Sequence, residues 1–283
     1  MFIDIHVHPD FYEPLNADPG KEQFRHDQMN IHHNGTAPIA HVFNQMECAG
    51  LDRLCLLAGE SSAPLDPSLV SNEEVRSLCN MHPNRFIGFA SVDPRRENAS
   101  ETLEFAFSEL KLAGLKLHPS RQQFDPSDPL MDPLYDICQK YDKPILFHSG
   151  VSWEPNTISW RARPLLFEEL AAKRPSLRIC LAHFGWPWVR ETAMLLLKYK
   201  NLYADTALLY FDSALECYRQ VFTLDIPFTW IDRSLRNQVM FGSNSPRFEQ
   251  IRMADAITKL GFRDSTLALI RGQNAIEFLR MEL

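Results

Sequence analysis

Short apolar runs rich in β-branched and aromatic residues recur along the chain and predict eight strands. They lie at Phe2–Val7, Arg53–Ala58, Phe86–Ser91, Gly114–Leu117, Pro144–His148, Arg178–Ala182, Asn201–Asp205 and Gln238–Gly242. Their starts are 23 to 51 residues apart. Because a strand–helix–strand unit needs roughly 30 residues or more, this spacing indicates a repeated βα architecture. Eight such runs favour a (β/α)8 TIM barrel of the α/β class over an open doubly wound sheet.

Helical patterns lie between these runs. The acidic first turn after Ser71 and the apolar positions Val75 and Leu78 predict a helix that begins there. Glu101–Leu112 is a second predicted helix, and we expect Gly114 to stop it.

Two long stretches rich in Pro, Asp, Asn and His show neither the helical nor the strand spacing of apolar residues. Pro9–Ala37 follows the first predicted strand, and Glu60–Ser71 follows the second. In a TIM barrel the catalytic loops follow the C-terminal ends of the strands. We therefore expect both stretches to be irregular and to cover that face of the barrel.

Composition narrows the class of protein. The chain has 283 residues, 45% of them hydrophobic, which suits one barrel domain spanning 1–283. A net charge of −7 and the absence of a basic stripe argue against a nucleic-acid partner. No apolar run reaches the roughly 18 residues of a membrane span, and MFIDIHVHPD lacks the regions of a secretion signal. We expect a cytoplasmic protein with no membrane partner, and its six scattered cysteines to be reduced and buried.

The first predicted strand ends in two histidines. Residues two apart in a strand point to the same side. We therefore expect His6 and His8 to face the barrel interior together, with Ile5 and Val7 packing outward. Two imidazoles on one side at that distance can chelate one divalent cation.

Polar residues also end three later strands. His148 ends the fifth, His183 the sixth, and Asn244 follows the eighth. A single buried histidine is more often a core residue than a ligand, but four histidines at three strand ends favour a metal site. Neutral imidazole suits zinc, manganese and iron. We expect one divalent metal ion, zinc first and manganese or iron as alternatives.

Longer motifs resemble the amidohydrolase-related family, a branch of the amidohydrolase superfamily that includes decarboxylases, hydratases and lactonases. The motifs are D-x-H-x-H in the first strand, HPNRFIGFASVDP at 82–94, GLKLHP at 114–119, KPILFHSG at 143–150, ARPLLFEELAAKRPSLRICLAHFGWPW at 162–188, LYADT at 202–206 and VMFGSNSP at 239–246. The resemblance implies that His6, His8 and His148 bind the metal and that His183 binds substrate or transfers a proton. It also implies a homodimer and a small-molecule substrate.

By the same resemblance, the residue after the eighth strand is ordinarily an aspartate that binds metal and acts as general base. Here it is Asn244. An amide oxygen can coordinate a metal but cannot accept a proton at neutral pH, so Asn244 predicts weaker metal binding and slower turnover. Three interpretations remain open: an engineered inactive variant, a natural enzyme with displaced chemistry, and a homologue that only binds.

Four further residues are candidates for substrate binding. Lys116 and His118 lie on one face of the fourth strand. The resemblance allows a carboxylated Lys116 that bridges two metals, but we favour an uncarboxylated lysine that binds a substrate carboxylate or pairs inside the barrel. Arg163 and Trp153 lie among aromatic residues after the fifth strand, where an arginine can hold a carboxylate. The alternative is that Arg163 pairs with Glu168 or Glu169 and packs the loop.

These features lead to competing functional hypotheses. The first is a metal-dependent hydrolase of a small ester, lactone or amide, and metal-dependent decarboxylation or another lyase reaction is the alternative. A non-catalytic ligand-binding homologue is motivated by Asn244. Lactone hydrolysis without a metal, with the same histidines binding substrate, is a further option within the resemblance.

Overall fold

Eight parallel strands form the centre of the structure. The computed structural model describes residues 1–31, 35–60, 68–154, 157–208 and 212–282. The strands are β1 (Ile3–Val7), β2 (Arg53–Leu57), β5 (Phe86–Ala90), β6 (Gly114–Leu117), β7 (Ile145–Phe147), β8 (Ile179–Leu181), β9 (Leu202–Asp205) and β10 (Val239–Met240), and each pairs with the next. Every predicted strand is confirmed, with its ends placed to within two residues.

Backbone hydrogen bonds join the last strand to the first. The amide of Ile5 donates to the carbonyl oxygen of Phe241 at 3.0 Å, and the amide of Asn244 donates to that of His6 at 3.0 Å. The sheet therefore closes on itself, and the predicted (β/α)8 barrel is confirmed.

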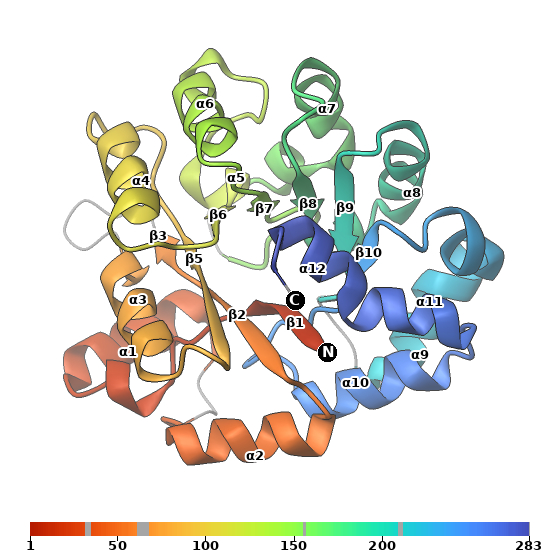
Figure 1. Cartoon of the computed structure of the whole chain (residues 1–283), viewed down its shortest axis with the longest axis horizontal. Helices are drawn as coiled ribbons and strands as arrows, with labels where there is room; N and C mark the ends of the chain where they lie inside the picture. The colour runs from red at the N-terminus through yellow and green to blue at the C-terminus, as the bar shows by residue number, and fades with distance from the viewer. Residues whose placement is uncertain (32–34, 61–67, 155–156, 209–211, 283) are drawn as a thin grey trace.

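Helices surround this barrel, as Figure 1 shows. The longer helices are α1 (Pro19–Met29), α2 (Ile39–Ala49), α3 (Asn72–Met81), α4 (Ala99–Ser108), α6 (Asp132–Lys140), α8 (Val189–Lys198) and α10 (Gln250–Lys259). The shorter helices are α5 (Pro119–Gln122), α7 (Glu168–Lys173), α9 (Ala214–Arg219), α11 (Asp264–Ala268) and α12 (Asn274–Leu279). A two-stranded ribbon pairs β3 (Gly59–Glu60) with β4 (Ser68–Val70). The predicted start of α3 is confirmed, because Ser71 and Glu74 form a reciprocal capping box.

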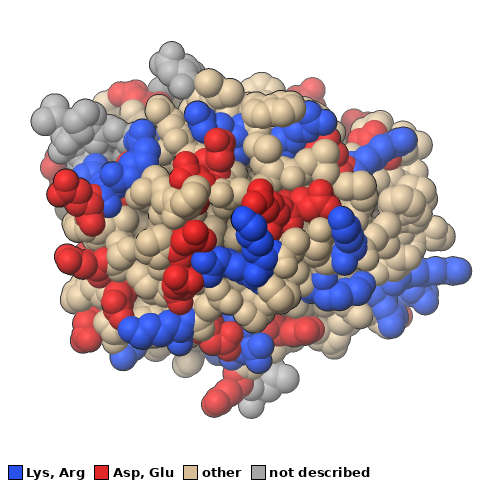
Figure 2. Space-filling model, turned by 90° about the horizontal axis from the view of Figure 1, so that it is seen from above, with Lys and Arg blue, Asp and Glu red and all other residues tan. Residues whose placement is uncertain are grey.

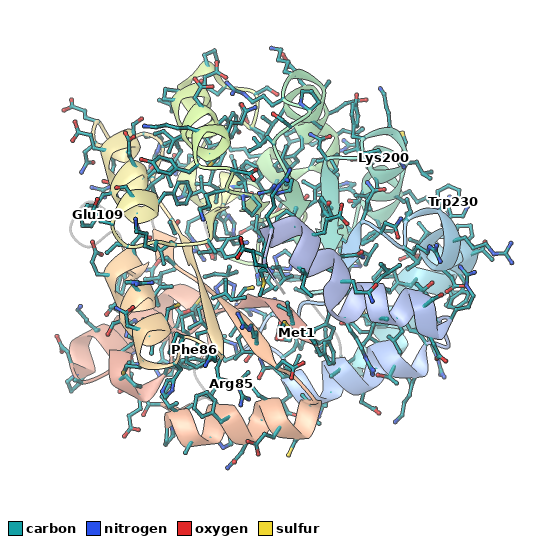
Figure 3. All side chains as sticks on the ribbon, in the orientation of Figure 1. Met1, Arg85, Phe86, Glu109, Lys200 and Trp230 are labelled. Carbon is teal, nitrogen blue, oxygen red and sulfur yellow. The ribbon has the colours of Figure 1, made fainter. Side chains whose placement is uncertain are left out.

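Apolar side chains fill two layers. The outer layer lies between the strands and the helices and includes Phe86, which is labelled in Figure 3. The ring centroid of Phe86 is 5.7 Å from that of Phe43. The inner layer fills the barrel itself, and Phe278 of α12 covers it at the N-terminal end of the strands. Both chain termini lie near that end (Figure 1). The C-terminal end of the barrel is left for the polar site.

A β-bulge interrupts the alternation in β1. Asp4 pairs with Leu54 and Val7 with Leu56, so β1 has one residue more than β2 between these pairs. Val7 packs in the outer layer as predicted, but Ile5 packs inside the barrel. The outward position predicted for Ile5 is therefore wrong, because the bulge shifts the phase of the strand.

The carboxylate of Asp4 links β1 to the segment after β10 and to helix α10. It accepts hydrogen bonds from the Ser243 amide at 2.9 Å, the Ser243 hydroxyl at 2.5 Å, the Gln250 amide group at 3.0 Å and the His6 amide at 3.2 Å. Burial raises the pKa of Asp4 to about 6. This buried network fixes the strand that carries His6.

Two predictions about loops need correction. Pro9–Ala37 contains helix α1, which apolar periodicity missed because the helix buries Arg25 instead of an apolar stripe. The guanidinium of Arg25 donates to the carbonyl oxygen of Leu69 at 2.8 Å. Gly114 does not stop α4, which ends at Ser108; it begins β6, where a side chain would collide with the ring of Phe89. Of Glu60–Ser71, residues 61–67 lie outside the described part of the chain.

The surface carries mixed charge. Figure 2 shows Lys and Arg interspersed with Asp and Glu over the visible face. None of the helices in the described segments is long and apolar enough to cross a membrane.

Candidate metal centre and active site

One cavity at the C-terminal end of the barrel gathers eight of the nine predicted site residues. It encloses about 740 Å³ of empty space, its open mouth included. The predicted residues in its wall are His6, His8, Lys116, His118, His148, Trp153, His183 and Asn244. They come from the ends of five different strands and from the loops that follow them, the arrangement typical of a barrel active site.

His6 and His8 face each other across this cavity. Their Nε2 atoms are 3.1 Å apart. The Nδ1 atom of His6 lies 2.8 Å from Oδ2 of Asp205, so Nδ1 carries the proton and Nε2 presents a lone pair. The bulge in β1 thus directs both imidazoles toward one point.

A second pair of histidines is oriented through a backbone carbonyl. Nδ1 of His183 donates to the carbonyl oxygen of Ala207, and a neutral His183 therefore accepts at Nε2. Nδ1 of His148 lies 3.1 Å from that Nε2 atom and is its donor. The proton on Nδ1 leaves Nε2 of His148 as a lone pair, and this buried atom has no hydrogen-bond partner among the described residues.

Burial keeps these imidazoles neutral. It lowers the pKa values of His6, His8 and His148 well below the usual range, and the neighbouring Lys116 lowers them further. A neutral imidazole is the form that coordinates a metal.

The geometry of the donors fits a small cation. Two nitrogens bound to one tetrahedral zinc ion at 2.0–2.1 Å lie about 3.3 Å apart, close to the observed separation of the His6 and His8 nitrogens. The lone pair of His148 at Nε2 lines the same cavity and is closed to water. His6, His183 and Asp205 also lie close enough together to hold an ion. Both oxygens of Asp205 already accept hydrogen bonds, so its observed role is to orient His6 and the backbone of His183.

Asn244 lies in the left-handed region of the backbone, with φ of 62°. Asn and Asp tolerate this conformation better than other residues that carry a side chain. The side chain of Asn244 is buried, and its Nδ2 group has no partner within the described segments. The position therefore suits an aspartate sterically, and the amide group of Asn244 is left with an unsatisfied donor among the described residues.

Lys116 and His118 line the cavity from the β6 side. The Nζ atom of Lys116 is buried and has no hydrogen-bond partner among the residues described, and burial lowers its pKa to about 7. The ring of His118 stacks on that of His148 with centroids 3.8 Å apart. Nδ1 of His118 accepts from the Arg121 amide, so Nε2 of the neutral ring is a donor.

Arg163 is the predicted site residue that lies outside the cavity wall. Its guanidinium binds Glu191, with Nε 2.8 Å and 3.1 Å from the two carboxylate oxygens, and lies over the rings of Trp160 and Trp188. The loop-packing alternative is therefore supported, although the partner is Glu191 and not the glutamates of α7. Trp153 lines the mouth and is 40% exposed.

Four charged residues of the cavity wall were missed by the sequence analysis: Asp10, Arg121, Glu154 and Arg247. Nothing in their local sequence marks them, because the short helix α5 brings Arg121 to the site and loops bring the other three. Asp205 was missed as well. It ends the seventh strand, so the rule that selected His148 and His183 would also have selected Asp205.

The loops after β7 and β8 are in direct backbone contact. Gly150 has φ of 104°, and a side chain there would place its Cβ atom 2.2 Å from the carbonyl oxygen of Trp186. The amide of Val151 donates to that same oxygen at 2.9 Å. His148 and His183 therefore stand on two loops that pack as one piece.

Comparison with known proteins agrees with this architecture. The family model described as Amidohydrolase matches residues 3–281. No curated protein matches the sequence significantly. Among solved structures, an uncharacterised TIM-barrel protein from Bordetella bronchiseptica is 20% identical, with a TM-score of 0.77 over 99% of this chain and 98% of that chain.

Two further similar structures contain ligands. A variant of 5-carboxyvanillate decarboxylase from Novosphingobium aromaticivorans, with bound manganese and 3-methoxy-4-hydroxy-5-nitrobenzoic acid, is 16% identical over 85% of this chain and 80% of that chain, with a TM-score of 0.62. A probable 2-pyrone-4,6-dicarboxylic acid hydrolase from Acinetobacter baumannii, with citric acid bound, is 14% identical over 99% of each chain, with a TM-score of 0.65. At these identities the likeness shows the fold alone.

Proposed function

Because the chain belongs to the amidohydrolase family, we propose that it is a metal-dependent hydrolase of a small carbonyl compound that carries a carboxylate. One observation carries the proposal. The nitrogens of His6 and His8 converge in a cavity whose wall also holds unpartnered atoms of His148, Lys116 and Asn244. Buried polar atoms in proteins are nearly always satisfied, so this concentration supports a site that binds a cation and an anionic ligand.

His6, His8 and His148 are the residues that would hold the cation, with the amide oxygen of Asn244 beside them. A bound divalent cation would lower the pKa of a water molecule and polarise the substrate carbonyl. Asp205 fixes the tautomer of His6, and His183 fixes that of His148.

Proton transfer needs a group other than Asn244. Both ring nitrogens of His183 are engaged in hydrogen bonds, which favours a positioning role for that residue. Lys116 is the better acceptor, because its amine is unpartnered and burial lowers its pKa to about 7. The proposal therefore places the base on β6 instead of after β10.

Metal-dependent decarboxylation is the second candidate. Arg121 and Arg247 are positively charged, and Lys116 is so when it is protonated; these three residues line the cavity and suit a substrate carboxylate. The similar decarboxylase structure holds a benzoic acid derivative together with manganese, which supports the same class of ligand here. The two reactions are separated by their products, since only decarboxylation releases carbon dioxide.

The test compares the native chain with the variant Asn244→Asp. Both are purified without chelator, analysed for metal, and assayed with esters, lactones, amides and carboxylated aromatics under added zinc or manganese. We expect the native chain to bind metal and turn over slowly, and Asn244→Asp to bind more tightly and react at least tenfold faster. Asn98→Asp, which adds the same charge at an exposed position, should change neither property.

Other outcomes would overturn the proposal in distinct ways. Turnover that survives removal of all metal would identify metal-free hydrolysis. Ligand binding without turnover in either form would leave a binding homologue. No stoichiometric metal in either form would remove the cation from the proposal.

A further inference from the structure

An ion pair occupies the cavity wall beside the proposed metal site. Arg121 lies on α5, three residues after His118, and Glu154 lies on the loop after β7. Nε of Arg121 is 3.0 Å and 2.9 Å from the two carboxylate oxygens of Glu154, and a second guanidinium nitrogen also contacts Oε1. The two side chains are only 14% and 20% exposed. The fork of Arg121 thus holds a carboxylate inside the cavity.

The Arg121–Glu154 pair differs from the Arg163–Glu191 pair in its location. Arg163 and Glu191 form the same two-point contact, but neither residue lines the cavity, and Arg163 packs between tryptophan rings. That pair has an evident role in packing the loop. Arg121 and Glu154 instead face the space that a substrate must enter.

The charges of the cavity wall favour exchange of one carboxylate for another. Arg121 and Arg247 contribute positive charge, and Asp10 and Glu154 contribute negative charge. A ligand carboxylate that replaced Glu154 on Arg121 would leave this balance unchanged. Glu154 is the more exposed partner, so its carboxylate can return to water when it is released.

A planar guanidinium binds any carboxylate through the same two parallel hydrogen bonds. We propose that Arg121 recognises the carboxylate of the substrate, and that Glu154 is a built-in competitor that occupies Arg121 until an acid displaces it. The inference rests on the proposed function for its substrate class. It adds that Arg121 binds the substrate carboxylate and that Glu154 sets the affinity an acid needs in order to displace it.

A double-mutant cycle on ligand binding tests this directly. Isophthalate is titrated into the zinc-saturated protein by calorimetry, and 3-carbamoylbenzoate, in which an amide replaces one carboxylate, is the comparison with one negative charge fewer. The proteins are the native chain, Arg121→Gln, Glu154→Gln and the double variant. We expect Glu154→Gln to bind isophthalate about tenfold more tightly and Arg121→Gln to bind it about tenfold more weakly.

The decisive comparison is the effect of Glu154→Gln in the Arg121→Gln background. If Glu154 competes for Arg121, that effect disappears once Arg121 is gone. Retention of the tightening in the double variant would overturn the inference, as would equal affinities of the native chain for isophthalate and 3-carbamoylbenzoate. Absence of isophthalate binding in both the native chain and Glu154→Gln would also overturn it.

Two control variants and a measurement of thermal unfolding distinguish a change in carboxylate binding from a loss of structure. Glu191→Gln breaks the matched pair outside the cavity and should leave both dissociation constants unchanged, and Arg121→Lys keeps the charge but loses the fork. Thermal unfolding of each variant identifies loss of structure. The readout is binding, so the cycle can succeed even if the chain proves inactive, and it can fail even if Asn244→Asp turns over substrate.

Discussion

His6 donates from Nδ1 to the carboxylate of Asp205 at 2.8 Å, joining the first strand of the barrel to the seventh. The hydrogen bond sets the tautomer of His6 and leaves Nε2 to face His8. The other oxygen of Asp205 accepts from the His183 amide at 2.7 Å, so one carboxylate orients two residues of the site.

Replacing this carboxylate should weaken metal binding without removing a direct ligand. We expect Asp205→Asn to raise the dissociation constant for zinc by about ten- to a hundredfold, because the orienting partner of a ligating histidine contributes that much. Metal titration with a competing chromophoric chelator measures the change. An unaltered zinc affinity would show that Asp205 does not orient His6 for metal binding.

Burial of Lys116 should make stability depend on pH. Its pKa falls from 10.5 to about 7 in the folded protein, so between these values the unfolded chain binds more protons than the folded one. The shift at Lys116 therefore contributes a rise in the free energy of unfolding as the pH increases across that window. Relative to Lys116→Met, the rise should be about 1.4 kcal/mol per pH unit. Urea unfolding at pH 7.5, 8.5 and 9.5 with chelator present tests this, and parallel curves for the two proteins would contradict it.

Removal of the Asp4 carboxylate should destabilise the barrel strongly. Asp4→Ala leaves donors of Ser243, Gln250 and His6 without an acceptor in a buried place, and we expect a loss of about 3–5 kcal/mol. Asp255→Ala removes an exposed carboxylate paired with Lys259 and should cost less than about 1 kcal/mol. Denaturant unfolding of the two variants under identical conditions compares them.

The cysteines should differ sharply in reactivity. Cys48 is exposed, which corrects the prediction that all six are buried, whereas the other five are buried as expected. Burial raises the pKa of Cys79 to about 11 and those of Cys55 and Cys180 well above the usual range. At pH 8 a disulfide reagent should label one thiol rapidly in the folded protein and six after unfolding. Cys48→Ser should abolish the rapid phase, and rapid labelling that persists in this variant would contradict the assignment.

The strands and most of the candidate site follow from the sequence because both depend on local pattern. An apolar run that ends in a polar residue marks a barrel strand and its catalytic end together, as at His148 and His183. The inward turn of Ile5 could not be predicted, since the bulge in β1 exists only through pairing with β2. Arg163 and Arg121 look alike in sequence. Only the path of the loops decides which guanidinium enters the cavity.

The contact of Gly150 with the backbone of Trp186 bears on how this barrel can be diversified. An insertion or deletion in either of the two loops would have to be matched by a change in the other, or His148 and His183 would lose their register. Variation in loop length is easier to accommodate after β1, where the connecting segment is longest. Libraries that seek new substrates on this scaffold should place their insertions there and keep the fifth and sixth loops fixed.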